Sequence, residues 1–338
     1  MNKNLNKFLI NKKSSIIKAI ELIDKTEYRQ CFVVDKNNKL LGSITDGDIR
    51  RGLIKKFSLD SNVIKIANKK PSYQKKSSYE KFSQSIKCIP IVNQKKQIIK
   101  IKFNKIKTKK IECALIMAGG KGTRLFPLTR NIPKALVKIN NKSLLESMIN
   151  KLKKDGFNNI AISVHHLSQK IKDHIKFKKI KNVKVSYINE KKPLGTAGAI
   201  SKIKFKDEHF LLLNCDVKLN IDFSKIIDFH ISNKSDITII SKRLIEKSPF
   251  GLINLDQKFR VRNIYEKPTL TKYISAGAYI FKSKIKKILK KNQRIDMDQL
   301  IKIAIKKNYR VVSYPLYENW NDLGTMNSLI KYKRYINK

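Results

Sequence analysis

Leu115-Ile-Met-Ala-Gly-Gly-Lys-Gly-Thr-Arg-Leu-Phe-Pro-Leu-Thr-Arg130, followed by Pro133-Lys134, is the stretch that decides the fold of this chain. The apolar run Ile111 to Met117 predicts a strand that is covered on both faces. The glycines that follow lack the side chains that would keep a phosphate away from backbone N–H groups. The sequence therefore predicts a phosphate-binding loop, and with it a nucleotide site, after a buried strand.

This loop has neither the spacing of a P-loop nor that of G-x-G-x-x-G. Its cations would balance the charge of a triphosphate; they are Lys121, Arg124 and Lys134. The residues expected to bind the nucleotide are Ala118, Gly119, Gly120, Gly122 and Thr123. A glycine-rich turn after a strand is weak evidence alone, and the full string is far more specific.

The chain has 338 residues, enough for two domains with separate cores. Its formal net charge of +49, from 75 Lys and Arg against 26 Asp and Glu, is of the size that suggests nucleic acid or an anionic membrane surface. The lysines are interleaved with Ile and Asn throughout and do not form one basic block with stacking aromatic residues. We interpret the charge as a compositional drift on solvated faces, with no specific nucleic-acid partner.

The cysteines and the N-terminus restrict the class of protein further. The four cysteines lie far apart with no C-x-x-C pair, so neither zinc nor a disulfide framework is indicated. The first residues carry positive charge without an apolar h-region, and no segment approaches about 18 uninterrupted apolar residues. A cytoplasmic protein without a membrane span is expected.

Residues 1 to about 103 are expected to form a small α/β module with an internal repeat, and such repeats bury one shared core. The first copy predicts a helix from Ser15 to Ile23 and strands from Cys31 to Asp35 and from Leu40 to Thr45. A second helix is expected to begin at Asp46. The second copy predicts a helix around Ser78 to Ser85 and strands at Cys88 to Val92 and Gln97 to Ile101. Asn104 to Lys110 is a polar, lysine-rich connector. The predicted domains are therefore residues 1–108 and 111–338.

The string Val-Val-Asp-x-x-x-x-Leu-Leu-Gly-x-Ile-Thr-Asp-Gly-Asp-Ile-Arg-Arg, from Val33 to Arg51, resembles a CBS-domain pair. This regulatory module commonly binds adenine nucleotides. The resemblance implies that Thr45 and Asp48, in the Thr-x-x-Asp element, hold phosphate and ribose. The second copy has no such element after Ile101, so at most one ligand site per chain is expected. A purely structural, dimer-forming role is the alternative.

The rest of the chain alternates strands and helices, which is typical of a mostly parallel α/β sheet. Ser143-Leu-Leu-Glu146 predicts a capping box at the start of a helix that ends at Gly156. The predicted strands are Ile160 to Val164, Val183 to Ile188, Phe210 to Leu213 and Ile237 to Ser241.

The glycine-rich string and Pro133-Lys134 resemble the signature of the sugar-phosphate nucleotidyltransferases. These enzymes join a nucleoside triphosphate to a sugar 1-phosphate and release pyrophosphate. The resemblance covers the whole region after the connector and implies a Rossmann-like domain. It also implies catalytic roles for Arg124, Lys134 and Lys267.

A transfer of this kind brings two anions together, so cations and a metal are needed. Mg²⁺ prefers oxygen ligands such as carboxylates at strand ends. Asp216 follows a buried run and matches the metal-binding Asp of the family's Asn-Gly-Asp element, with Cys215 in place of Gly. Asp322 in Trp320-Asn-Asp-Leu-Gly-Thr325 matches the family's Trp-x-Asp-x-Gly-Thr element. The resemblance implies that both carboxylates bind Mg²⁺.

Three further motifs lie between these carboxylates. Pro193-Leu-Gly-Thr-Ala-Gly-Ala199 is expected to open a helix, whose N-terminus would face phosphate while the backbone of Gly195 and Thr196 reads a base edge. Its form resembles that of guanylyltransferases. Tyr265-Glu-Lys-Pro268 matches the family's Glu-Lys-Pro element, which implies that Glu266 accepts sugar hydroxyls and Lys267 pairs with the sugar phosphate. The remaining sugar-binding residues would be Gly251, Ser275 and Gly277, with Ser275 in place of the usual Asn.

The sequence is therefore interpreted as an Mg²⁺-dependent transferase acting on GTP and a sugar 1-phosphate. Its CBS pair makes it similar to glucosamine-1-phosphate guanylyltransferases of nonulosonic (legionaminic) acid pathways. A uridylyl-, thymidylyl- or cytidylyltransferase of the same fold is one alternative, and a non-catalytic nucleotide sensor is another. A homo-oligomer is expected.

Overall fold

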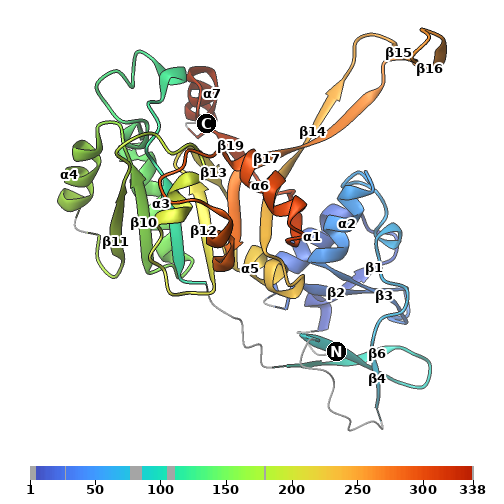
Figure 1. Cartoon of the computed structure of the whole chain (residues 1–338). Helices are drawn as coiled ribbons and strands as arrows, with labels where there is room; N and C mark the ends of the chain where they lie inside the picture. Colours follow the sequence, from blue (N-terminus) through green and yellow to red (C-terminus); the bar gives the residue numbers. More distant parts are fainter. Residues whose placement is uncertain (1–4, 27, 77–85, 105–110, 179, 337–338) are drawn as a thin grey trace. The chain divides into compact units, whose positions relative to one another are not determined.

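The computed structural model describes residues 5–26, 28–76, 86–104, 111–178 and 180–336 (Figure 1). The chain divides into two compact units, Met1–Thr108 and Lys109–Lys338. The helix predicted around Ser78 to Ser85 lies outside the described residues, as does the predicted connector apart from Asn104. No helix within the described residues is long and apolar enough to cross a membrane.

The N-terminal unit contains one three-stranded arrangement twice. In each copy a short strand pairs in parallel with a second strand, which pairs antiparallel with a third. Both antiparallel pairs shift register near the end of the second strand, between Val33 and Val34 and between Ile91 and Val92. The elements are β1 (Leu9–Asn11), α1 (Ile16–Asp24), β2 (Gln30–Val34), β3 (Leu40–Thr45), α2 (Asp46–Ile54), β4 (Gln74–Lys75), β5 (Cys88–Val92) and β6 (Ile98–Phe103), with 3₁₀ turns at Leu5–Lys7 and Val63–Lys65.

The two copies share one core, which confirms the predicted internal repeat. Phe32 and Leu40 of the first copy pack in one cluster with Val92 and Ile98 of the second. The sheets also meet through the backbone, where the N–H of Leu40 donates to the carbonyl of Lys96 at 2.9 Å. Sequence patterning missed β1 and β4 because strands of three and two residues are too short to show alternation.

The C-terminal unit is built on a seven-stranded sheet with the order β11-β10-β7-β12-β17-β14-β18. Only β17 runs antiparallel to its neighbours in this sheet, so the predicted mostly parallel fold is confirmed. The strands of the sheet are β7 (Cys113–Met117), β10 (Asn159–Val164), β11 (Lys184–Asn189), β12 (His209–Asn214), β14 (Ile237–Lys247), β17 (Thr269–Lys282) and β18 (Val311–Leu316).

The shorter strands and the helices complete this unit. The strands outside the large sheet are β8 (Lys138–Ile139), β9 (Lys142–Ser143), β13 (Val217–Leu219), β15 (Leu252–Leu255), β16 (Val261–Tyr265) and β19 (Trp320–Asp322). The α-helices are α3 (Leu144–Lys154), α4 (Ser168–Lys178), α5 (Phe223–Ser232), α6 (Met297–Lys306) and α7 (Met326–Ile336). The 3₁₀ helices are η3 (Thr123–Leu125), η4 (Lys134–Leu136), η5 (Gly198–Lys202) and η6 (Ser283–Ile288).

The sheet is covered on both faces, as its continuous apolar strands require. Ala114 and Ile116 of β7 face a cluster built with α3, α4 and α5. Cys113 and Leu115, at the alternate positions, face a second cluster built with η5, η6 and α6. Because neighbouring side chains of a strand point to opposite faces, one short strand anchors both layers.

α3 begins and ends where the sequence predicts, but its N-terminus is capped differently. The Ser143 hydroxyl accepts the N–H of Glu146 at 3.1 Å. The carboxylate of Glu146 does not return the bond; it pairs with Lys178 Nζ of α4 at 3.2 Å. The predicted capping box is therefore only half formed, because an ion pair with the next helix competes for its second half. Gly156, with φ +91°, ends the helix in the left-handed region.

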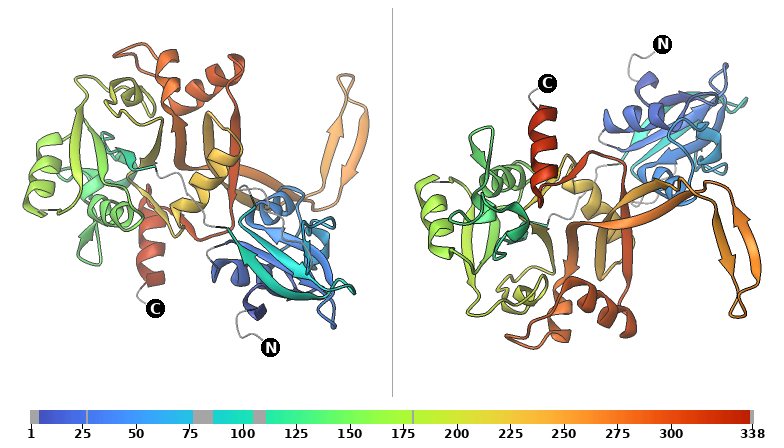
Figure 2. Two further views of the ribbon diagram at one scale, coloured as in Figure 1. Left: turned by 90° about the horizontal axis from the view of Figure 1, so that it is seen from below. Right: turned by 90° about the horizontal axis from the view of Figure 1, so that it is seen from above.

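The outer halves of β14 and β17 leave the sheet as a two-stranded arm that continues into β15 and β16 (Figures 1 and 2). Their pairing runs on from Ser241 opposite Ser275 to Lys247 opposite Thr269. β14 is therefore longer than the predicted Ile237 to Ser241; its outer half is partly or fully exposed and lacks the apolar pattern of a core strand, so the sequence did not indicate it.

His230 of α5 is a buried base that the fold holds neutral. Its Nδ1 lies 2.8 Å from the hydroxyl of Thr238 and its Nε2 lies 3.0 Å from Nδ1 of His209. Burial, and then the neighbouring His209, lowers the pKa of His230 from 6.5 to about 3. Between these two values the unfolded chain binds a proton at this position that the folded chain does not bind.

We therefore expect acid to destabilise the C-terminal unit through His230. From pH 7 to pH 5 this group should lower the free energy of unfolding by about 2 kcal/mol. His230→Gln should remove that part of the pH dependence. Urea titrations followed by the fluorescence of Trp320, the only tryptophan of the chain, measure it, and equal pH slopes for the two proteins would contradict this assignment.

Candidate active site

The loop after β7 presents backbone donors at the carboxyl end of the sheet. Within the described residues, the N–H groups of Gly119, Gly120 and Lys121 donate to no protein acceptor. A Cβ built on Gly120 would meet no atom within 4 Å, so this side of the loop is open. Ala118 differs: it is buried, and its N–H donates to the carbonyl of Ser163 at 3.0 Å. It supports the loop, and its N–H is not available to a ligand.

Gly122 is where the loop needs a glycine most. Its φ of +69° lies in the left-handed region, and a Cβ would lie 2.9 Å from Cβ of Lys134. The hydroxyl of buried Thr129 donates to the Gly122 carbonyl at 2.7 Å and closes the loop. The cation Lys134 is thus packed directly against the loop, whereas Thr123 and Arg124, in η3, are exposed.

Pairing of β13 with β19 brings the two predicted metal ligands together. Val217 lies opposite Asp322 in this antiparallel pair, and the N–H of Leu323 donates to the carbonyl of Asp216 at 2.9 Å. The two aspartates are far apart in the sequence and adjacent in the fold. Asp216 also follows β12, which pairs in parallel with β7. The carboxylates therefore lie at the same end of the sheet as the loop.

Lys134 lies with these carboxylates. Its Nζ makes an ion pair with Oδ2 of Asp216, and each side chain is only 12% exposed. A Cβ built on Gly324 would lie 2.7 Å from Asp322 Oδ1, 2.8 Å from Asp216 Oδ2 and 3.0 Å from Lys134 Nζ. The three charged groups therefore surround one point, and the absence of a side chain at Gly324 leaves room for them.

These residues fit a magnesium ion. Mg²⁺ is usually held by one or two carboxylates together with water and substrate phosphates, and Asp216 and Asp322 supply two. Within the described residues there is no group of three or more His, Cys, Asp and Glu that could hold a metal, which is a set that a structural zinc would need. All four cysteines are buried, and burial raises the pKa of each thiol to about 12.

The motif from Pro193 to Ala199 is arranged differently from expectation. It leads into η5, a 3₁₀ helix of five residues, so no α-helix N-terminus faces a phosphate here. Gly195, with φ +75°, packs against the backbone of Ile295. The N–H of Thr196 donates to Asp296 Oδ1 at 3.0 Å. Asp296 is the residue before α6. The Thr196 N–H, which the sequence assigned to a base edge, is therefore already bonded within the protein.

The residues predicted to bind the sugar separate into two groups. Gly277, with φ +70°, lies beside the carboxylates: a Cβ there would be 2.8 Å from Cγ1 of Val217 and 3.0 Å from Nδ2 of Asn214. The Ser275 hydroxyl lies 2.7 Å from the hydroxyl of Tyr279. Both residues lie midway along β17, where the arm leaves the sheet.

Glu266, Lys267 and Gly251 form the second group, on the arm. A Cβ on Gly251 would lie 3.1 Å from Oε2 of Glu266, so these two residues are brought together. The Glu266 and Lys267 side chains are 75% and 68% exposed, with 3.8 Å between their charged atoms. The strand from Ser275 to Thr269 covers about 20 Å at roughly 3.3 Å per residue, and both lie beyond it. The structure does not bring them to the carboxylates.

Thr45 and Asp48 of the N-terminal unit bond to each other. The Thr45 N–H and hydroxyl donate to Asp48 Oδ2 at 2.8 and 2.7 Å, and the Asp48 N–H returns to the hydroxyl at 3.3 Å. This capping box starts α2, and Asp48 also pairs with Arg51 at 2.6 Å. A cavity of about 310 Å³ in this unit is lined by other residues, among them Lys69, Lys70 and Tyr73.

Sequence reasoning did not single out three residues that shape the site. Gly324 and Thr129 lie inside quoted motifs, but their roles depend on contacts with partners far along the chain. Asp296 carried no signal except its place before a helix, although the structure shows it as the partner of Thr196. Only the fold shows which residue of a motif supports which other residue.

Family models match both units. One described as nucleotidyl transferase matches residues 113–338, and one described as CBS domain matches residues 1–55. The catalytic subunit beta of mannose-1-phosphate guanylyltransferase from Drosophila melanogaster is 33% identical over 175 residues, which are 50% of this chain and 47% of that protein. A UTP–glucose-1-phosphate uridylyltransferase from Synechocystis sp. is 29% identical over 203 residues, 54% and 52% of the two chains. The chain thus spans about half the length of these relatives.

A solved structure matches about two thirds of this chain. The crystal structure of HddC from Yersinia pseudotuberculosis is 26% identical with a TM-score of 0.54, and the match covers 67% of this chain and all of HddC. A second crystal structure of HddC, described as complexed with GMP-PN, gives 25% identity and the same TM-score and coverage.

The two loop glycines should respond differently to alanine. Gly122→Ala should lower the melting temperature by roughly 4 to 8 °C, because it combines left-handed backbone with a close contact to Lys134. Gly120→Ala should leave the melting temperature unchanged and weaken triphosphate binding roughly tenfold, because its methyl group enters open space where the phosphate would approach. Thermal scans and triphosphate titrations measure both, and equal effects of the two variants would contradict the loop assignment.

Proposed function

The chain belongs to the nucleotidyl transferase family, and on that premise we propose that it transfers a guanylyl group from GTP to a sugar 1-phosphate and releases pyrophosphate. One observation carries the proposal: Asp216, Asp322 and Lys134 surround one point beside a loop with unpaired N–H groups. Carboxylates for a metal, a cation and oriented donors are the groups that phosphoryl chemistry requires.

In the proposed reaction a phosphate oxygen of the sugar 1-phosphate attacks the α-phosphorus of GTP. The bond from that phosphorus to the bridging oxygen breaks, and pyrophosphate leaves with the electron pair. The N–H groups of Gly119, Gly120 and Lys121 bind triphosphate oxygens and fix their direction. Arg124, exposed beside the loop, balances charge on the leaving pyrophosphate.

Asp216 and Asp322 would hold Mg²⁺, which supplies charge neutralisation for the phosphates when it is bound. Lys134 pairs with Asp216 where both side chains are largely buried, and there an unpaired carboxylate would be costly. It therefore holds the Asp216 carboxylate directed at the point left open by Gly324. Its packing against Gly122 links the position of the carboxylates to that of the loop.

The choice of guanine is supported by a relative named as a guanylyltransferase and by the GMP-PN complex of HddC. The uridylyltransferase relative keeps UTP as the first alternative. For the acceptor, the sequence resemblance suggests glucosamine 1-phosphate, whereas the relative from Drosophila is named for mannose 1-phosphate. Both acceptors belong in the test.

Lys267 and Glu266 enter this proposal as acceptor-binding residues on the arm. They can contact a sugar phosphate beside Gly277 only when the arm bends toward the carboxylates, because the straight arm holds them roughly 20 Å or more away.

A non-catalytic nucleotide sensor is the second candidate function. The buried ion pair of Asp216 and the alignment of Asp322 with it favour the enzyme, because binding alone does not need two metal carboxylates.

A regulatory adenine nucleotide in the N-terminal unit is the remaining part of the proposal. Its support is the match of a CBS domain to residues 1–55. A ligand at Thr45 and Asp48 would have to share groups that now cap α2. Calorimetry of the full chain with AMP tests it, and the absence of heat would leave this unit with a role in assembly.

We expect pyrophosphate release to be fastest with GTP in a panel of GTP, UTP, dTTP and CTP. Each triphosphate is paired with mannose 1-phosphate, glucosamine 1-phosphate and glucose 1-phosphate. A preference of tenfold or more for UTP over GTP would overturn the guanylyl assignment and keep the reaction class. No release with any pair, at saturating Mg²⁺, would favour the sensor.

Asp216→Asn should lower turnover by roughly 100-fold or more and leave the fold intact. The amide cannot replace the charge of a metal ligand, and one lost electrostatic contact of this kind is worth about 2.7 to 4 kcal/mol. Asp298→Asn is the matched control, because Asp298 is 65% exposed on α6. Near-normal turnover of Asp216→Asn, at an unchanged melting temperature, would sink the assignment.

A further inference from the structure

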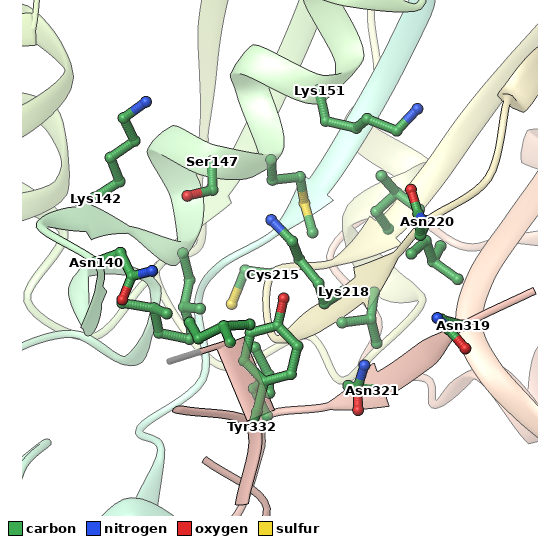
Figure 3. Close-up of a pocket in the computed structure, with 18 of the residues that line it drawn as sticks. Asn140, Lys142, Ser147, Lys151, Cys215, Lys218, Asn220, Asn319, Asn321 and Tyr332 are labelled. Carbon is green, nitrogen blue, oxygen red and sulfur yellow. The ribbon is translucent and has the colours of Figure 1, made fainter. Parts of the chain in front are cut away.

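A cavity of about 590 Å³ lies next to the carboxylates in the C-terminal unit (Figure 3). Residues of α3, β13, β19 and α7 line it, and none of them is a residue assigned above to substrate or metal. The volume is in the range of ligand sites for small molecules. The proposed reaction does not use this cavity.

The cavity is positively charged. Lys218 points into the space between α3 and Tyr332, with Lys142 and Lys151 to either side (Figure 3). Burial, and then repulsion from Lys151 and Lys142, lowers the pKa of Lys218. No Asp or Glu lines the cavity in the described part of the chain. Lys151 pairs with Asp155 at 2.5 Å, outside the lining. An anion is the ligand charge that this arrangement favours.

The floor of the cavity is apolar. Met148 and Leu152 of α3 meet Phe223 of α5 and Leu213 of β12, and all four are buried. Side-chain amides also line the cavity, those of Asn140, Asn220, Asn319 and Asn321 (Figure 3). An apolar floor with a few polar and cationic groups suits a molecule that has a ring or an alkyl body and an acidic group.

The walls of the cavity are continuous with the site. Cys215 and Val217 line it and flank Asp216. Leu323 lines it, follows Asp322, and donates its N–H to the carbonyl of Asp216. A ligand that contacts these three residues therefore acts on the β13–β19 pairing that aligns the carboxylates.

We propose that this cavity binds a small anionic effector with an aromatic or aliphatic body, and that its occupancy changes turnover at the carboxylates. The change of turnover rests on the proposed function. The binding of the effector does not depend on it.

The probe is 8-anilinonaphthalene-1-sulfonate, a molecule with an aromatic body and one anionic group, added to the full chain. Energy transfer from Trp320 reports binding, because Trp320 is the only tryptophan and lies on β19 between two lining residues. Lys218→Met removes the central charge and should weaken binding roughly tenfold. Ser147→Phe should fill the cavity and block binding without adding a second tryptophan. Lys153→Met is the control, because Lys153 is exposed on α3 and does not line the cavity.

A single saturable site that weakens in Lys218→Met and is unchanged in Lys153→Met would support the binding. Equal affinity in wild type, Lys218→Met and Ser147→Phe would overturn it, and Lys218→Met decides alone if Ser147→Phe does not fold. Pyrophosphate release is then measured with and without the probe. A change of about fivefold or more in wild type that is absent in Lys218→Met supports the coupling, and binding without any change of rate overturns it. If wild type releases no pyrophosphate in the absence of probe, the proposed function fails and the binding result still stands.

Discussion

The pairing of β13 with β19 is the contact on which the candidate site depends. It joins two segments about a hundred residues apart, aligns Val217 with Asp322, and is extended by the bond from the N–H of Leu323 to the carbonyl of Asp216. Backbone hydrogen bonds between the two segments thereby fix the positions of both aspartates. Paired strands hold the two carboxylates in place more firmly than a loop would. Gly324 follows directly and leaves the space that the charged groups share.

Electrostatics and packing act together at this point. Lys134 neutralises Asp216 where both are largely buried, so neither charge is left without compensation. The same lysine packs against Gly122, whose left-handed backbone shapes the phosphate loop. A displacement of the loop would therefore move the Lys134 side chain, and this in turn would move the Asp216 carboxylate that pairs with it. The cavity beside β13 and β19 is lined by Cys215, Val217 and Leu323, the neighbours of the two carboxylates.

Much of the fold was predictable because local patterns and packing agree. The apolar run before the loop is β7, the Ser143 cap starts α3, and the N-terminal repeat reappears as two matching sheets. The short strands β1 and β4 were missed because two or three residues carry no period. The outer half of β14 was missed because it is stabilised by pairing with β17 outside the apolar core.

By itself the sequence determined the mostly parallel α/β class, the loop, and the types of residue that could hold a nucleotide and a metal. These follow from short spacings and from side-chain chemistry, which are local properties. Tertiary structure alone decided that Asp296 takes the donor of Thr196 and that Lys267 stands away from the carboxylates on an arm. Each of these depends on which distant segment lies alongside, and a spacing within one motif carries no information about that.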